Sequence, residues 1–263
     1  LASGDTAGAL AYVDDLISKS EMSQELRYLK AGVLAANGKY DEATAEFESL
    51  LQDTPGSTAV VMALSNLKAI EGDREASLAV INGGLEVNPD NRALLFAKAG
   101  MLERNRDFEG AIAIYEKLYA ENSASVVIAN NLASTITTYR DSREDLERAY
   151  TVARRLRNTQ VPAFQDTYGW IAARLGNYDE ALSYLESAAA ALPNEPLAQF
   201  HLAETYAGLG RKAEAVATYQ EVLDLQEEGS EPSYLARVTS EMQRLQAEID
   251  AEASAAGAVE VNQ

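Results

Sequence analysis

The stretch "DTYGWIAARLGNYDEALSYLESAAAALP", from Asp166 to Pro193, carries the pattern from which the fold of this chain is predicted. It places a small residue, Gly169, among aromatic residues, then a second glycine at Gly176, an alanine at Ala181 and a proline at its end. Small residues let two helices cross closely, glycine ends a helix in the left-handed conformation, and proline stops the second helix. The stretch therefore predicts two helices joined by a tight turn.

The same pattern recurs along the chain with a spacing of 34 residues. Aligning Gly38 in "NGKYDEAT" with Gly176 in "LGNYDEAL" superimposes the flanking residues, so the chain is read as six stacked hairpins. The repeat that starts at Val126 is two residues longer than the others. The predicted repeats cover residues 24–57, 58–91, 92–125, 126–161, 162–195 and 196–229.

Three columns of the repeat predict how the helices meet. The eighth position is small, and it holds Ala31, Ser65, Ala99, Ala133, Gly169 and Ala203. The twentieth position is also small, and it holds Ala43, Ser77, Ala111, Ala149, Ala181 and Ala215. We expect the two helices of each repeat to cross at these columns, because longer side chains would separate them. The turn column holds Gly38, Gly72, Gly176 and Gly210, for which we expect a positive φ. Arg106 replaces this glycine in the third repeat, and there we expect a tighter or distorted turn.

This spacing of small residue, glycine, small residue and proline resembles the tetratricopeptide repeat family, and the resemblance covers most of the chain. It implies an all-α fold: a right-handed α-solenoid of antiparallel helix pairs with a capping helix at the C-terminal end. The segments "NNLAS" and "DTYGW" resemble solenoids of many bacterial proteins, which are often exported or associated with the envelope. On that resemblance the bacterial periplasm or envelope is slightly favoured over the cytoplasm.

The two ends of the chain extend the register. Residues 1–23 are predicted to be a half repeat that supplies a second helix only. Residues 230–252 carry apolar residues at helical spacing, which predicts a helix that covers the last repeat with one face and meets water with the other. Residues 253–263 lack this periodicity and are predicted to be a flexible tail.

Composition argues against several functional classes. The chain has 22 basic and 41 acidic residues, a formal charge of −19, and this field repels phosphate backbones, so nucleic acid is excluded as an expected partner. The chain contains no cysteine, and His201 is its only histidine, so no metal site or cofactor is predicted. We expect His201 to be packed or hydrogen-bonded rather than catalytic. No apolar run reaches the ~20 residues that span a bilayer, and no catalytic motif is found, so a non-enzymatic protein is predicted.

In the tetratricopeptide repeat family, the fifth, ninth and thirteenth positions of each first helix face an inner groove. The resemblance therefore implies a partner-binding surface formed by Tyr28, Met62, Asn66, Phe96, Arg104, Asn130, Asp166, Trp170, Arg174, Phe200 and Glu204. Aromatic residues and arginine carry much of the energy of protein interfaces, and Trp170 is the first candidate for an anchor. Packing against the next first helix is the alternative for Tyr28 and Phe96. The chaperone-binding carboxylate clamp and the asparagine ladder of sugar-transferase solenoids, two specialisations of the family, are not expected, because the required residues are missing.

The longer fourth repeat is locally basic, with Arg140, Arg143, Arg148, Arg154, Arg155 and Arg157. One interpretation is a contact site for the carboxylates of a partner. The other is an extended helix whose arginines pair with Asp141, Glu144, Asp145 and Glu147.

Three hypotheses of function follow. The first is a non-catalytic scaffold that binds a peptide or helix of a protein partner in the groove. The second is an accessory domain of a larger enzyme or of a cell-envelope assembly protein, such as a secretion or exopolysaccharide system. The third is a structural solenoid that associates with itself.

Overall fold

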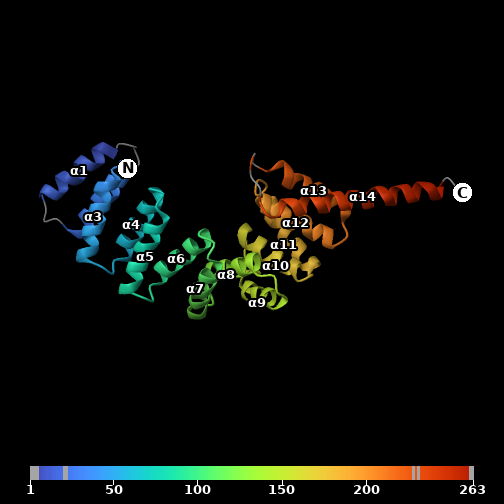
Figure 1. Cartoon of the computed structure of the whole chain (residues 1–263), viewed down its shortest axis with the longest axis horizontal. Helices are drawn as coiled ribbons and strands as arrows, with labels where there is room; N and C mark the ends of the chain where they lie inside the picture. Colours follow the sequence, from blue (N-terminus) through green and yellow to red (C-terminus); the bar gives the residue numbers. More distant parts are fainter. Residues whose placement is uncertain (1–5, 20–22, 227–228, 230–231, 261–263) are drawn as a thin grey trace. The chain divides into compact units, whose positions relative to one another are not determined.

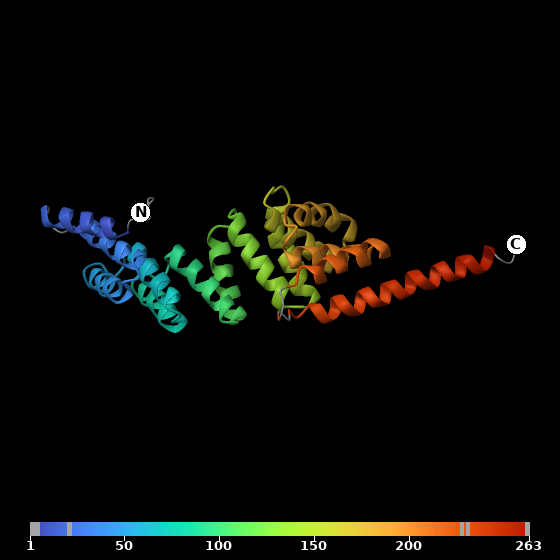
Figure 2. The ribbon, with the colours of Figure 1, turned by 90° about the horizontal axis from the view of Figure 1, so that it is seen from above.

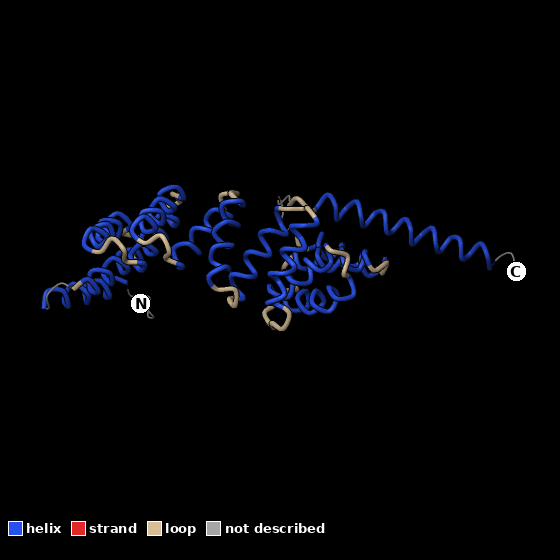
Figure 3. Tube along the Cα trace, turned by 90° about the horizontal axis from the view of Figure 1, so that it is seen from below, coloured by secondary structure: helices blue, strands red, loops and turns tan. Residues whose placement is uncertain are grey.

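The computed structural model describes residues 6–19, 23–226, 229 and 232–260. Across these ranges the chain forms α-helices and one short 3-10 helix, and no strand occurs in them (Figure 1, Figure 3). The chain divides into two compact units, Leu1–Leu118 and Tyr119–Gln263, which are described separately. The all-α solenoid of paired helices predicted from the sequence is confirmed.

The first unit contains a single helix followed by three helical hairpins. Its helices are α1 (Thr6–Lys19), α2 (Gln24–Ala36), α3 (Tyr40–Asp53), α4 (Thr58–Ile70), α5 (Arg74–Val87), α6 (Arg92–Arg104) and α7 (Phe108–Glu121), the last of which ends in the second unit. The first helices begin at Gln24, Thr58 and Arg92, the residues at which the sequence register starts each repeat. Side-chain oxygens of Ser23 and Asn91 accept hydrogen bonds from the first turns of α2 and α6, which fixes these starts.

The second unit contains three hairpins and a long final helix. Its helices are α8 (Val126–Tyr139), α9 (Arg143–Ala153), the 3-10 helix η1 (Arg154–Leu156), α10 (Pro162–Arg174), α11 (Tyr178–Ala191), α12 (Pro196–Gly208), α13 (Lys212–Asp224) and α14 (Leu235–Glu260). Proline occupies the first position of α10 and α12, where its missing N–H costs no hydrogen bond. Each first helix contacts its own second helix, and α10 also contacts the first helices α8 and α12.

Both small columns lie in the core, as the sequence predicts. The alanines of both columns are fully buried, and the serines Ser65 and Ser77 are 1% exposed. At Gly169 a Cβ would lie 2.7 Å from Cγ of Leu185 and 3.2 Å from the carbonyl oxygen of Ala181, so α10 and α11 cross with room for a hydrogen atom only. In the second repeat Ser65 and Ser77 each donate a hydroxyl hydrogen bond to the other's carbonyl oxygen, which satisfies both polar groups.

The turns between paired helices confirm the expectation for the four turn glycines and contradict the one for Arg106. The four predicted turn glycines have positive φ, between 72° and 86°. Arg106 has a φ of 64° and makes the same two closing hydrogen bonds, from its own N–H to Glu103 and from the N–H of Asp107 to Leu102. The expected tighter or distorted turn is therefore not found. The hydrogen bonds of the turn and the packing of α6 and α7 hold the arginine in the left-handed region, at a conformational cost that glycine avoids.

The C-terminal helix is longer than predicted. Helix α14 spans Leu235–Glu260, so residues 253–260 of the predicted tail are helical, and residues 230–231 and 261–263 lie outside the described residues. Val238 and Leu245 are buried against Ala215, Tyr219 and Val222 of α13. Figure 2 shows α14 continuing beyond the end of α13. Lys212 of α13 forms ion pairs with Glu248 and Glu252, which supports the helix where its apolar stripe ends.

The basic fourth repeat does not form the extended α-helix of the second interpretation. Helix α9 ends at Ala153, and the 3-10 helix η1 follows it directly. Arg140 pairs with Asp145, and Arg143 pairs with Glu147, as the second sequence interpretation expects. Arg157 reaches Glu180 of α11 instead of an acidic residue of its own repeat. The local pairing therefore accounts for part of this cluster, while Arg154 and Arg155 stay exposed.

Candidate partner-binding cavity

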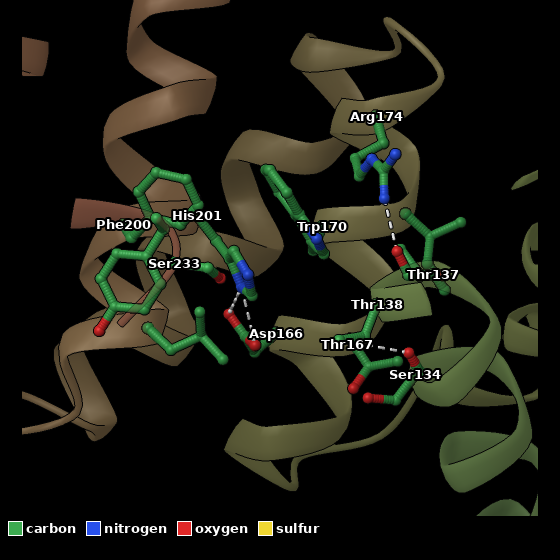
Figure 4. A pocket seen from close by; sticks show the side chains of 13 residues that line it. Ser134, Thr137, Thr138, Asp166, Thr167, Trp170, Arg174, Phe200, His201 and Ser233 are labelled. Atoms are coloured by element: carbon green, nitrogen blue, oxygen red, sulfur yellow. Dashed lines mark hydrogen bonds and ion pairs between the residues drawn. The ribbon is translucent and has the colours of Figure 1, made fainter. Parts of the chain in front are cut away.

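A cavity of about 210 Å³ opens between the first helices of the second unit (Figure 4). Its walls come from α8, α10 and α12, and the segment before α14 adds a further wall. The residues that line it are Ser134, Thr137, Thr138, Asp166, Thr167, Trp170, Ile171, Arg174, Leu197, Phe200, His201, Ser233 and Tyr234. The first helices of three hairpins and the residues just before α14 are therefore needed to form it.

Aromatic rings form the centre of the cavity wall. Trp170 stacks on His201, with ring centroids 4.2 Å apart and an interplanar angle of 12°. Phe200 lies 5.8 Å from Trp170 and stacks on Tyr234 at 4.9 Å. Figure 4 shows Trp170 between His201 on one side and Arg174 on the other. Because the tryptophan is held by its neighbours, it offers a partner a rigid surface that loses little conformational entropy on binding.

His201 and Asp166 form a hydrogen bond between the fifth and sixth repeats. Nδ1 of His201 lies 2.9 and 3.0 Å from the two carboxylate oxygens of Asp166. A carboxylate only accepts, so Nδ1 carries the proton and donates it, and Nε2 is left as an acceptor in the neutral imidazole. The expectation that His201 is packed and hydrogen-bonded is confirmed, since it is also 6% exposed.

The threonine hydroxyls of the cavity donate to their own helices. Thr137, Thr138 and Thr167 each donate to the carbonyl oxygen four residues earlier, at 2.7, 2.9 and 3.0 Å. A hydroxyl whose proton is used in this way can only accept a hydrogen bond from a ligand. Thr138 is exposed and offers its hydroxyl oxygen as an acceptor at the wall, whereas Thr137 and Thr167 are buried.

Arg174 connects α10 to the C-terminal end of α8. One guanidinium nitrogen donates to the carbonyl oxygen of Thr137, and another lies 2.7 Å from a carboxylate oxygen of Asp141. A helix C-terminus leaves carbonyl groups without intrahelical partners, so the arginine satisfies one of them and complements the helix dipole. The residue predicted to bind a partner thus also has a structural role.

A second hollow of about 350 Å³ adjoins the first and shares Trp170, Arg174 and Phe200 with it. Arg237 of α14 grips the carboxylate of Glu204 with two nitrogens, and the Tyr219 hydroxyl donates to the same carboxylate at 2.6 Å. Burial, together with this hydrogen bond to a carboxylate, raises the pKa of the Tyr219 hydroxyl. Burial by itself would lower the pKa of Arg237, but its contact with Glu204 outweighs that effect and the pKa is raised. Both groups therefore keep their protons.

A polar cluster on the other face of α10 fixes the helix that carries the cavity. The Tyr168 hydroxyl and the Tyr150 hydroxyl each donate to Glu180, both at 2.6 Å, and Arg157 donates to Glu180 at 2.7 Å. Burial raises the pKa of Glu180, but these three hydrogen bonds outweigh it and the net pKa lies below its ordinary value. Burial also raises the pKa of Tyr168, which stays protonated. The cluster joins α9, the segment after η1, α10 and α11.

The structure gathers five of the predicted site residues in this region: Asp166, Trp170, Arg174, Phe200 and Glu204. Asn130, from the fourth repeat, lies outside both linings, and its side-chain nitrogen donates to the Asn131 side chain at 3.3 Å. Phe200 is 6% exposed, so it forms the floor of the cavity.

The predicted site residues of the first unit have other surroundings. Tyr28 packs edge-on against Phe47 of its own repeat at 5.7 Å, and Phe96 packs in the same way against Tyr115 at 5.9 Å. These ring contacts are made with the second helix of the same repeat, and not with the next first helix that the alternative named, and Tyr28 stays 38% exposed. Met62 is half-buried against a core cluster, and Asn66 and Arg104 are exposed.

Sequence reasoning missed the residues that complete the cavity. Leu197 and Tyr234 line it from positions outside the three predicted columns, and Tyr234 lies outside the repeats. The sequence offers one signal for His201, which is its position next to Phe200 on α12. Both rings contact Trp170 of the neighbouring first helix. Nothing in the sequence register indicates that the segment before α14 returns to the cavity.

Sequence models of the tetratricopeptide repeat match residues 1–67, 34–100 and 169–230, more than half of the chain together. A TPR repeat-containing protein of Pseudomonas aeruginosa is 27% identical to the chain over 178 residues. That match covers 65% of this chain but 29% of the relative, so the chain spans less than a third of the relative's length.

Solved structures with the same fold include YrrB, described as a TPR protein with an unusual peptide-binding site. It has a TM-score of 0.55 and 17% identity, over 70% of this chain and 93% of that one. The Cut9–Hcn1 hetero-tetramer of the APC/C matches with a TM-score of 0.62 and 15% identity, over 92% of this chain and 46% of that one. At these identities the likeness shows the fold alone.

The repeat register, the helical hairpins and these matches define an α-solenoid of the kind that serves as a scaffold for protein–protein interactions. The chain belongs to the tetratricopeptide repeat family, and its relative in Pseudomonas is consistent with the bacterial type. Proteins of this family are in general non-catalytic and bind protein partners. In the described part of the chain, no helix is long and apolar enough to cross a membrane.

Proposed function

We propose that the second unit binds a segment of a protein partner in the cavity formed by α8, α10 and α12, and that the chain acts there as a non-catalytic scaffold. The observation that carries this proposal is the aromatic wall of Trp170, Phe200 and Tyr234, which lines the same cavity as the Asp166 carboxylate. Buried aromatic anchors surrounded by a polar rim are typical of the energetic centres of interfaces. A cavity of about 210 Å³ is large enough for one or two side chains of a partner rather than a whole helix.

The rim of the cavity offers a substitution that closes it without disturbing the core. Thr138 is exposed, lines the cavity and lies near the C-terminus of α8. An arginine at this position would extend over the opening, and its charge is favourable at a helix C-terminus. Thr151 of α9 is the matched control, because it is also exposed and its hydroxyl also donates to the carbonyl four residues earlier.

The test compares proteins captured from cells by the native chain, Thr138→Arg and Thr151→Arg, each immobilised at equal density and quantified by mass spectrometry. We expect a set of proteins that the native chain and Thr151→Arg retain and that Thr138→Arg loses. Thermal melting of the three chains checks that they are equally folded. Equal capture by all three chains would contradict the proposal that this cavity binds the partner.

A second proposal is that the solenoid is an accessory part of a larger enzyme or of a cell-envelope assembly protein. It is supported by the Pseudomonas relative, whose length far exceeds the matched segment. An immunoblot of the natural host with an antibody against residues 58–252 measures the size of the native polypeptide. A band at the 28.4 kDa of this chain contradicts the proposal, and a much larger band supports it.

A further inference from the structure

The charges that face the cavity show what a partner has to supply. Asp166 and Arg174 are the charged side chains in its lining when His201 is counted as neutral. The donors of Arg174 are directed to the carbonyl of Thr137 and to Asp141, so its charge is balanced within the fold. With a neutral imidazole, the hydrogen bond from Nδ1 of His201 leaves the negative charge of the Asp166 carboxylate in place.

The polar lining adds acceptors to this charge. In the neutral imidazole, Nε2 of His201 is an acceptor, since Nδ1 donates to Asp166. The hydroxyls of Thr138 and Thr167 accept because they donate to their own helices. A carboxylate offers about four acceptor positions, of which the imidazole N–H occupies one side. A ligand group that is rich in donors and positively charged complements this wall, whereas a carboxylate would meet repulsion.

The aromatic part of the wall suits the stem of a long basic side chain. Lysine and arginine bury their methylene groups against apolar surfaces while the charged end stays in a polar site. Phe200 and Tyr234 form such a surface, because their rings stack and line the same cavity as Asp166. A cation near these rings also gains electrostatic attraction from their π faces.

The charge of the whole chain points to the same chemistry. A formal charge of −19 raises the local concentration of basic segments and speeds their association. On this basis, and resting on the proposed function, we infer that the partner inserts a lysine or arginine side chain into the α8–α10–α12 cavity and places its charge against Asp166. Asp166 then determines specificity, and His201 positions its carboxylate.

The probes are four peptides, acetyl-Gly-Leu-Xaa-Leu-Gly-amide, in which Xaa is lysine, arginine, glutamine or glutamate. Trp170 is the only tryptophan of the chain and lines the cavity and the adjoining hollow, so its fluorescence reports binding in this region and not at remote acidic surfaces. Titrations are made with the native chain, with Asp166→Asn and with Asp179→Asn. Asparagine at position 166 can still accept the His201 hydrogen bond. Asp179 is exposed on α11 and is absent from both linings, so its variant removes one charge elsewhere.

The lysine and arginine peptides are expected to bind the native chain and Asp179→Asn about 10-fold more tightly than the glutamine peptide, as the loss of a charge-assisted hydrogen bond predicts. Asp166→Asn is expected to abolish this preference. Raising the salt concentration should weaken the binding of the lysine and arginine peptides and leave the affinity of the glutamine peptide unchanged.

Two outcomes overturn the inference. In the first, all four peptides bind the native chain with equal affinity and Thr138→Arg loses this binding. The cavity then binds peptides without preferring a cation, and the proposed function stands. No fluorescence response to the lysine and arginine peptides also overturns it, and the proposed function is then decided by the capture experiment with Thr138→Arg and Thr151→Arg.

Discussion

The first helices of the two units carry residues in the same repeat columns but use them differently. In the second unit, Asp166 and Arg174 bond to side chains or carbonyls of other helices, and this forms a cavity. In the first unit, Tyr28 and Phe96 pack against rings of their own repeats. Arg104 occupies the column of Arg174 and is exposed. A repeat position thus decides which way a side chain faces, whereas the neighbouring first helices decide whether a site is formed.

The close crossing at Gly169 gives the largest expected effect. In Gly169→Val the new side chain would overlap Leu185 and the carbonyl of Ala181, and we expect a loss of about 3 kcal/mol in the free energy of unfolding. Gly32 of the first unit is the control, since a Cβ there has no neighbour within 4 Å. Gly32→Ala should stabilise by about 0.5 kcal/mol, because it lies inside a helix.

Urea denaturation measures both changes, with Trp170 fluorescence for the second unit and far-UV circular dichroism for the whole chain. Adding Leu185→Ala to Gly169→Val should recover part of the loss. Full additivity of the two substitutions would show that Gly169 and Leu185 are not in conflict.

The Glu180 cluster predicts a dependence on pH that is confined to the second unit. The pKa of Glu180 in the folded chain lies below the ordinary value of 4.5. The stabilisation by the cluster is therefore present above about pH 4.5 and is lost as the pH falls through the folded pKa. At about pH 7, Glu180→Gln should cost about 2 kcal/mol, because hydrogen bonds to a charged acceptor are removed.

The difference between native chain and Glu180→Gln should therefore shrink as the pH falls from about 7 to 3. Denaturation followed by Trp170 fluorescence at several pH values measures it, and the exposed Asp179→Asn variant is the control. A difference that stays constant with pH would contradict the assignment of a lowered pKa to Glu180.

Arg174 and Arg104 allow a direct comparison of one column in two units. Arg174→Met removes the bond to the Thr137 carbonyl and the contact with Asp141, and a loss of about 1 kcal/mol is expected. Arg104→Met should change the free energy of unfolding by less than about 0.5 kcal/mol, as exposed substitutions usually do. Urea denaturation of both variants is the measurement. Equal losses would mean that the column itself, and not its neighbours, determines the role.

The smallest effect is expected at the turn between α6 and α7. Arg106→Gly relieves the left-handed conformation of an L residue but increases the freedom of the unfolded chain, so a gain of about 0.5 kcal/mol is expected. Gly38→Arg, at the corresponding turn of the first repeat, should have the opposite sign. Far-UV circular dichroism in urea measures both. A destabilised Arg106→Gly variant would show that the arginine side chain contributes more than the strain costs.

The helix pairs, their starting residues and the buried columns can all be predicted from the amino-acid sequence. These features depend on local rules: alanine-sized residues where helices cross, glycine or a tolerated substitute at φ > 0, and proline at a helix start. Such rules act within one hairpin, so each copy repeats them and the register at Gln24, Thr58 and Pro162 is visible without coordinates. The periodicity of apolar residues did not predict the full length of α14, because an alanine-rich segment needs no apolar stripe to remain helical.

Which of the predicted wall residues contact one another depends on tertiary packing. The pairing of His201 with Asp166 spans 35 residues, and Tyr234 reaches Phe200 from outside the repeats. These contacts depend on how successive hairpins stack and on the path of the chain before α14, which a repeat column does not encode. Side chains in one column share a direction, but a cavity forms where the neighbours on three helices complement one another in charge and shape.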